Sequence, residues 1–178
     1  MVRPSRVLAI PGTSEATAPV SSGGSTGAGL DTGTTSADRL IRRVRELQAR
    51  TNGFTAFITW PLQPENTPSM SHMPKTDAVT YLRTVAMSRI VLDNVPNLQS
   101  SWVTMGMKVG QMALNYGCND FGSLMIEENV VSAANTTHRT TVDELDRLIR
   151  DAGFTPARRR QDYSLISGGA QAHATVAA

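Results

Sequence analysis

Apolar and polar residues follow two different periods along residues 38–158 of the chain. In several segments the apolar positions recur every three or four residues, and this spacing is typical of amphipathic helices. A Thr141-Val142-Asp143-Glu144 capping box opens the last of them. The predicted helices are residues 38–51, 76–92, 109–116, 127–134 and 141–152.

Short runs rich in aromatic and β-branched residues lie between these helices, and such runs are typical of strands. The predicted strands are residues 54–60, 98–104, 120–125 and 154–158. The alternation of helix and strand implies right-handed crossovers and a parallel sheet with helices on one side. The expected fold class is therefore α/β, a partial (β/α) barrel of about four parallel strands.

A barrel of this kind needs eight strands to close. The strands at 54–60 and 154–158 would therefore be open edges, through which the chain is expected to self-associate. The body, residues 38–166, is expected to be part of a larger fold or to need a partner.

The two ends of the chain differ from the body in composition. Residues 1–37 consist mostly of Ser, Thr, Gly, Ala and Pro, so they offer little apolar surface to offset their chain entropy. They are predicted to be a disordered head, with a transit peptide as the less favoured alternative. Residues 167–178 are again rich in Gly and Ala and are predicted to be a frayed tail.

Charge and cysteine content narrow the function classes. Lys and Arg number 17 and Asp and Glu 15, so a net charge of +2 gives no reason to expect a nucleic-acid or membrane partner. Apolar runs are too short for a transmembrane helix, and the expected location is cytoplasmic. With Cys118 as its single cysteine, one chain cannot form an internal disulfide, a cysteine-based zinc site or a cysteine-ligated iron–sulfur cluster.

Six blocks of the body, in order, carry a resemblance to a known family. They resemble the C-terminal half of cyclic dehypoxanthine futalosine synthase, a radical S-adenosylmethionine enzyme of the futalosine route to menaquinone. Aminofutalosine synthase and deazaflavin-precursor synthase are sister families, but Trp60-Pro61 and the run Asn119–Ser123 look closer to the cyclase. The blocks are residues 53–64, 81–84, 92–104, 117–123, 127–134 and 150–157.

The resemblance implies a cofactor chemistry that this chain lacks the residues to start. In the family, a Cys-x3-Cys-x2-Cys loop in the N-terminal half holds a [4Fe–4S] cluster that reduces S-adenosylmethionine, and the resulting radical acts on a nucleoside substrate. This chain is expected to hold no such cofactor alone, and Cys118 is predicted to be a packing residue. Two hypotheses follow: the missing half is on another polypeptide, or the chain is a truncated, non-catalytic remnant or binding module.

Candidate substrate-binding residues lie where predicted strands end, because parallel barrels carry their chemistry at that edge. Trp60 could stack on a ring with Gln63 hydrogen-bonding beside it, or it could simply pack the rim. Trp102 and Thr104 end the next strand. No catalytic or metal-binding residue is assigned.

The third predicted strand carries the other candidates, Asn119, Asp120, Ser123 and Glu128. The alternative interpretation is structural, because Asn-Asp is a common turn and acids are favoured at a helix N-terminus. Arg158-Arg159-Arg160 is interpreted as a solvated charge run.

Overall fold

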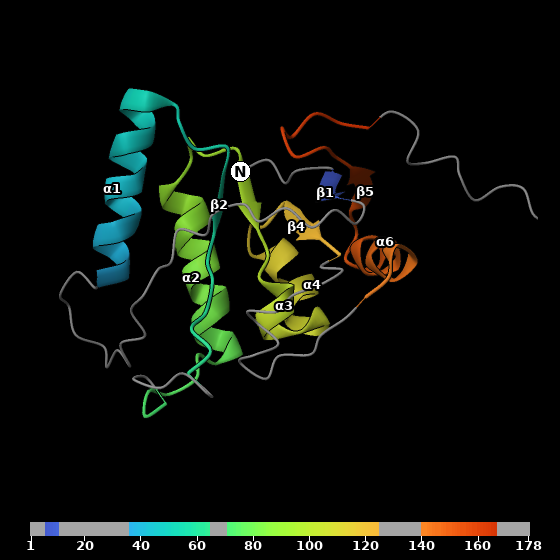
Figure 1. Ribbon diagram of the computed structural model, residues 1–178, viewed down its shortest axis with the longest axis horizontal. Coiled ribbons are helices and arrows are strands. Elements are labelled where there is room, and N and C mark those ends of the chain that lie inside the picture. Colours follow the sequence, from blue (N-terminus) through green and yellow to red (C-terminus); the bar gives the residue numbers. More distant parts are fainter. Residues whose placement is uncertain (1–5, 11–35, 65–70, 125–139, 167–178) are drawn as a thin grey trace, which may run out of the picture.

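The computed structural model describes residues 6–10, 36–64, 71–124 and 140–166, which contain one parallel sheet (Figure 1). The strand order is β2-β3-β4-β1-β5, and every neighbouring pair is parallel. The strands are β1 (Arg6–Ile10), β2 (Ala56–Ile58), β3 (Asn97–Gln99), β4 (Asp120–Ser123) and β5 (Thr155–Arg158). The helices are α1 (Ser36–Thr51), α2 (Ala78–Val91), α3 (Trp102–Met105), α4 (Met107–Asn115) and α6 (Val142–Asp151).

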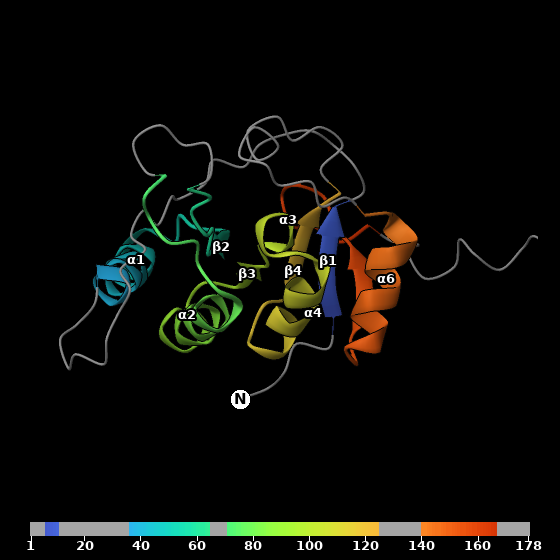
Figure 2. The same cartoon turned by 90° about the horizontal axis from the view of Figure 1, so that it is seen from below.

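The helices follow one side of the curved sheet (Figures 1 and 2). Strands β2 and β5 are its two edges, as predicted for the strands at 54–60 and 154–158. The α/β architecture of a partial barrel is thus confirmed. Among the described helices, none is long and apolar enough to cross a membrane.

Strand β1 departs from the sequence prediction. Residues 6–10 belong to the segment predicted as a disordered head, yet they pair with β4 on one side and with β5 on the other. The prediction rested on the composition of the whole segment. Five residues that read Arg-Val-Leu-Ala-Ile are a short strand-like run inside it, and the average composition concealed them.

The second predicted strand is also shorter than expected. Strand β3 ends at Gln99, and the backbone turns at Ser100 and Ser101 into the short helix α3. The Ser101 N–H donates to the Tyr81 hydroxyl at 2.9 Å, and the Ser101 hydroxyl donates to the Thr59 carbonyl. These two bonds tie the turn to α2 and to the end of β2, so Trp102 starts a helix and does not continue a strand. The helix predicted at 127–134 lies outside the described residues.

Helices α3 and α4 pack closely against β4, where Gly110 meets Trp102 and Phe121. Trp102 is 1% exposed, and its indole N–H donates to the Phe121 carbonyl at 2.8 Å. Gly110 of α4 lies directly against it, since a Cβ built at Gly110 would come within 2.6 Å of the Trp102 Cβ. Glycine at this position therefore allows the close approach that seats the tryptophan.

The packing at Gly110 yields a stability prediction. We expect Gly110→Ala to destabilise the fold by about 1–3 kcal/mol, because the added methyl overpacks a rigid contact. Gly53→Ala is the control, because Gly53 is exposed and its nearest neighbour is the hydroxyl of the exposed Thr51. Urea unfolding of the two variants measures the difference, and equal midpoints would contradict the assigned packing.

Candidate functional site

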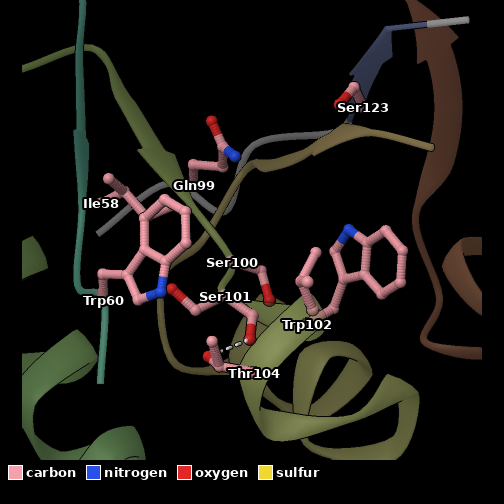
Figure 3. Close-up of a pocket in the computed structure, with 9 residues that line it drawn as sticks. Ile58, Trp60, Gln99, Ser100, Ser101, Trp102, Thr104 and Ser123 are labelled. Atoms are coloured by element: carbon pink, nitrogen blue, oxygen red, sulfur yellow. Dashed lines mark hydrogen bonds between the residues drawn. The ribbon is translucent and has the colours of Figure 1, made fainter. Parts of the chain in front are cut away.

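A pocket lies at the carboxyl ends of β2, β3 and β4 (Figure 3). Its empty volume, which is open to solvent, is about 310 Å³. Four of the predicted candidates line it, namely Trp60, Trp102, Thr104 and Ser123. The structure thus brings together residues that are 63 positions apart in the sequence, at the edge of the sheet where the sequence analysis placed them.

Trp102 forms a wall of this pocket but offers it no polar group. Its indole N–H is already bonded to Phe121, and its side chain is almost fully buried. Trp102 therefore shapes the pocket through packing.

Three hydroxyl groups of the pocket lining donate their hydrogens to backbone carbonyls. Ser100 donates to Gly110 at 3.3 Å, Thr104 donates to Ser101 at 3.1 Å, and Ser101 donates to Thr59. A hydroxyl has a single hydrogen, so each of these oxygens is left with acceptor capacity only. A ligand that meets these oxygens has to supply the hydrogen-bond donors.

Trp60 and Gln63 do not share the pocket as the sequence analysis expected. Trp60 is half-buried and lines the pocket, whereas Gln63 is buried outside the lining and donates to the Pro61 carbonyl at 3.3 Å. The amide that accompanies Trp60 in the pocket belongs to Gln99. Gln99 is opposite Asp120 of β4 in the sheet, and no local residue pattern encodes that register.

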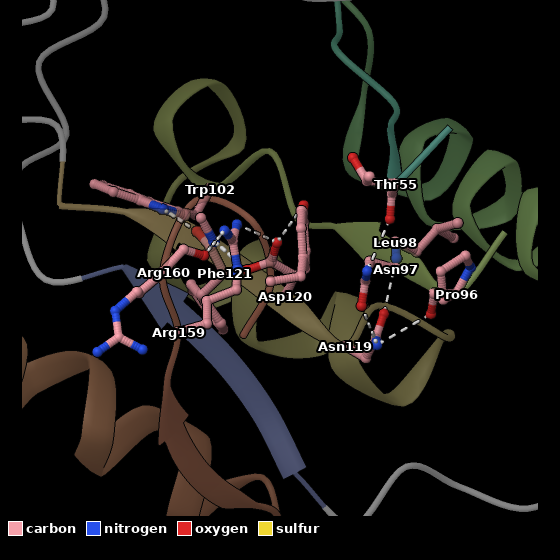
Figure 4. Close-up of polar contacts among 12 residues, drawn as sticks. Thr55, Pro96, Asn97, Leu98, Trp102, Asn119, Asp120, Phe121, Arg159 and Arg160 are labelled. Atoms are coloured by element: carbon pink, nitrogen blue, oxygen red, sulfur yellow. Dashed lines mark hydrogen bonds and ion pairs between the residues drawn. The ribbon is translucent and has the colours of Figure 1, made fainter. Parts of the chain in front are cut away.

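Asp120 is buried in a cluster with Arg159 (Figure 4) and Tyr163. Both residues belong to the C-terminal segment, residues 159–166, which follows β5. Its carboxylate accepts from the Arg159 guanidinium at 2.6 and 3.3 Å, from the Tyr163 hydroxyl at 3.1 Å and from the Gly122 N–H at 2.9 Å. The Arg159 guanidinium also lies 3.9 Å from the centre of the Tyr163 ring. The contacts of Asp120 are thus with the protein itself.

Electrostatics in this cluster are those of a tightly packed ion pair. Burial raises the pKa of the Asp120 carboxyl, and the charge of Arg159 acts in the opposite direction. Burial and the nearby Asp120 carboxylate raise the pKa of the Tyr163 phenol, which therefore remains protonated and donates to Asp120.

The basic run at 158–160 was interpreted as solvated, and this interpretation is wrong for Arg159. The Arg159 side chain is 2% exposed, and Arg158 pairs with Asp146 at 2.8 Å. Only Arg160 is exposed. Because side chains alternate between the two faces at the end of β5, these three arginines have different surroundings. Nothing in the sequence indicated that Arg159 would pair with Asp120.

Asn119 lies at the start of β4, away from the pocket. Its side-chain oxygen accepts from the Leu98 N–H at 2.8 Å and from Arg89 at 2.9 Å, while its amide nitrogen donates to the Pro96 carbonyl at 3.2 Å (Figure 4). These bonds hold the N-terminal end of β4 against the N-terminal end of β3. Glu128 lies outside the described residues.

Cys118, which directly precedes Asn119 in the chain, is fully buried. Burial raises the pKa of its thiol from the ordinary value of 9.0 to about 12. A neutral, inaccessible thiol cannot act as a metal ligand or nucleophile without rearrangement of the core. The prediction that Cys118 is a packing residue agrees with this burial.

Comparison with known proteins places the chain in a family. Residues 51–171 match the family described as the CofH/MqnC C-terminal region. The chain is 56% identical over 126 residues to the cyclic dehypoxanthine futalosine synthase of Halalkalibacterium halodurans, covering 71% of this chain and 34% of that protein. It is 46% identical over 139 residues to the synthase of the same name from Streptomyces coelicolor, covering 75% of this chain and 34% of the relative.

A different activity is named for a more distant relative. The 5-amino-6-(D-ribitylamino)uracil–L-tyrosine 4-hydroxyphenyl transferase of Methanothermobacter thermautotrophicus is 37% identical over 129 residues, covering 69% of this chain and 35% of that protein. The chain thus spans about a third of the length of these relatives.

The buried ion pair yields a prediction about stability. Asp120→Asn leaves the Arg159 charge buried without a counter-charge, and we expect it to lower the free energy of unfolding by about 3–5 kcal/mol. Arg160→Gln, at the exposed neighbour, is expected to change it by about 0.5 kcal/mol or less. Urea unfolding is the measurement, and similar losses in the two variants would contradict the role given to Asp120.

The buried thiol yields a prediction about pH. In the unfolded chain Cys118 ionises near pH 9, whereas the folded chain keeps the proton to about pH 12. The contribution of this group to stability is therefore complete below pH 9 and decreases as the pH rises above it. We expect the unfolding free energy of the wild type to fall more steeply between pH 8 and 10 than that of Cys118→Ala.

Thiol labelling provides an independent measurement. With Ellman's reagent, we expect no reaction of the native protein and one thiol per chain in urea. Rapid labelling of the native protein would contradict the assigned burial.

Proposed function

Because the chain belongs to the CofH/MqnC C-terminal region family, we propose that it is the C-terminal part of a cyclic dehypoxanthine futalosine synthase that acts in menaquinone biosynthesis. The observation that supports this most directly is the pocket at the carboxyl ends of β2, β3 and β4, because its lining lies entirely within the segment that matches the family. Parallel barrels bind their substrates at this edge.

The role of this chain is to bind and orient substrate. Trp60 and Trp102 provide aromatic walls, and the oxygens of Ser100, Ser101 and Thr104 provide acceptors for substrate hydroxyls. The Asp120–Arg159 pair holds β4 and the C-terminal segment together beside the pocket. These groups position a ligand and keep water from its buried face.

The residues of this chain do not fit an iron–sulfur cluster. The chain has one cysteine, which is buried, and the part of the chain that the structure describes holds no group of three His, Cys, Asp or Glu suited to a metal ion. Such a cluster takes three or four thiolates from its protein. A cluster would therefore be held by a separate N-terminal part.

That N-terminal part would dock along the edges of the sheet. Strands β2 and β5 each have a strand neighbour on one side only among the described strands. The unpaired backbone groups of β2 can accept a further parallel strand from another polypeptide, whereas the Arg158 carbonyl of β5 already accepts from the Ile166 N–H at 2.9 Å. Completion of the barrel would then enclose the pocket.

The hydroxyphenyl transferases are the second candidate for the parent activity. The identity of 37% with a transferase against 56% with the synthase favours the synthase. The further alternative is a non-catalytic binding module.

Complementation tests the proposal. The N-terminal two thirds of the Halalkalibacterium halodurans synthase, ending before the region that matches this chain, would be reconstituted anaerobically with iron and sulfide and mixed with this chain. We expect consumption of dehypoxanthine futalosine with S-adenosylmethionine only when both polypeptides are present. The intact synthase is the positive control.

Two results would contradict the proposal. One is the failure of the mixture to turn over substrate while the intact synthase does so under the same conditions. The other is the absence of a complex between the two polypeptides in sedimentation.

A further inference from the structure

Strand β1 lies inside the sheet but comes from outside the segment that matches the family. It pairs in parallel with β4 on one side and with β5 on the other (Figure 2). Strands β2 to β5 all lie within residues 51–171, whereas β1 is Arg6–Ile10. The matching segment therefore provides both strands that flank this place, and the strand between them comes from elsewhere. We call the space between β4 and β5 the strand slot.

The width of the strand slot is set by residues of the matching segment. Neighbouring strands lie about 4.8 Å apart, so β4 and β5, which have one strand between them, are about 10 Å apart. Asp120 begins β4 and Arg159 directly follows β5, and their buried side chains meet at 2.6 Å across this gap. The ion pair therefore fixes a spacing that leaves room for one strand.

The two walls of the strand slot pair differently with β1. Strand β5 pairs with it over four consecutive residues, from Arg6 opposite Thr155 to Ala9 opposite Arg158. Strand β4 pairs with it at two positions, and the register shifts between them. One regular ladder of four residues thus holds β1, and another strand of similar length can form the same ladder.

The irregular wall is a property of β4 itself. The shift in register coincides with Gly122, which has a φ of 75° and donates its N–H to the Asp120 carboxylate at 2.9 Å. Gly122 also lies against the Gln99 amide, because a Cβ built there would come within 2.4 Å of the Gln99 Nε2. These residues belong to the matching segment, so any strand that enters the slot meets the same wall. The strand that fits is short, parallel to β5 and free of proline at its centre.

We propose that β1 is a placeholder, and that a parallel strand of the N-terminal part fills the strand slot in the assembled enzyme. This rests on the proposed function, because it names a second place, besides the β2 edge, at which that part joins the sheet. Backbone hydrogen bonds to β5 supply the affinity, as in donor-strand complementation. In the chain alone, β1 pairs with both walls and keeps the slot from a second copy.

A peptide tests whether the slot accepts a strand from another molecule. The probe is a fluorescein-labelled peptide of residues 3–12, and a scrambled peptide of the same composition is the control. Leu8→Pro, in the full chain, removes a backbone N–H at the centre of β1 and weakens its pairing. Because β1 competes for the slot in the wild type, we expect the variant to bind the probe about tenfold more tightly by fluorescence anisotropy.

Hydrogen exchange tests whether the N-terminal part is the natural occupant. The wild-type chain is measured alone and with the reconstituted N-terminal two thirds of the Halalkalibacterium halodurans synthase. In the mixture we expect the amides of β1 to exchange about tenfold faster or more, while those of β5 stay protected. The amides of α2, which does not border the slot, are the internal control, and in Leu8→Pro they report whether the variant is folded. This measurement on the wild type needs no variant.

Several outcomes would overturn the proposal. They are equal binding of the probe and the scrambled peptide, equal affinity of folded Leu8→Pro and the wild type for the probe, and unchanged protection of β1 in the mixture. A mixture that turns over substrate while β1 stays protected would remove the strand exchange and leave the proposed function. Binding of the probe without complementation would remove the proposed function, and with it the N-terminal part as the occupant of the slot.

Discussion

The buried pair of Asp120 and Arg159 is the interaction on which the rest of this sheet depends. Asp120 begins β4 and Arg159 follows β5, and strand β1 lies between those two strands. The ion pair therefore joins two strands that share no backbone hydrogen bonds with each other. The Asp120 carboxylate also accepts hydrogen bonds from the Gly122 N–H and the Tyr163 hydroxyl. One buried charge therefore fixes the β4 backbone and the C-terminal segment together.

A buried ion pair of this kind contributes more to specificity of arrangement than to net stability. Desolvation of two charges offsets much of their attraction, but removal of one partner leaves the other uncompensated. The two hydrogen bonds from Arg159 and the third from Tyr163 satisfy the Asp120 carboxylate in only one arrangement of these elements. Alternative registers of the sheet would leave that charge unpaired.

Periodicity predicted much of this fold. The helices at 38–51, 76–92 and 141–152, the parallel pairing and the two edge strands follow from residue patterns that span several turns or a whole run. The turn at Ser100 and Ser101 could not be predicted in the same way, since it depends on bonds to Tyr81 and Thr59, which are distant in sequence. Strand β1 was missed because the composition of residues 1–37 outweighed five strand-like residues.

The candidate site was predictable in position and less so in its members. Trp60, Trp102, Thr104 and Ser123 line the pocket because parallel strands end at a common edge. Gln99 and Arg159 were missed because their importance depends on which residue lies opposite them, and register is a property of the sheet as a whole. The partners of Asn119 and Asp120 are also distant in sequence, so the contacts that occupy these two side chains could not be predicted from local patterns.

The contact between Gln99 and Gly122 has a consequence for how these sequences diverge. A side chain at position 122 and a long amide at position 99 would occupy the same space. The end of the Gln99 side chain can move away, but the φ of 75° at Gly122 strains any other residue, so among homologous chains position 122 is expected to stay glycine while position 99 varies.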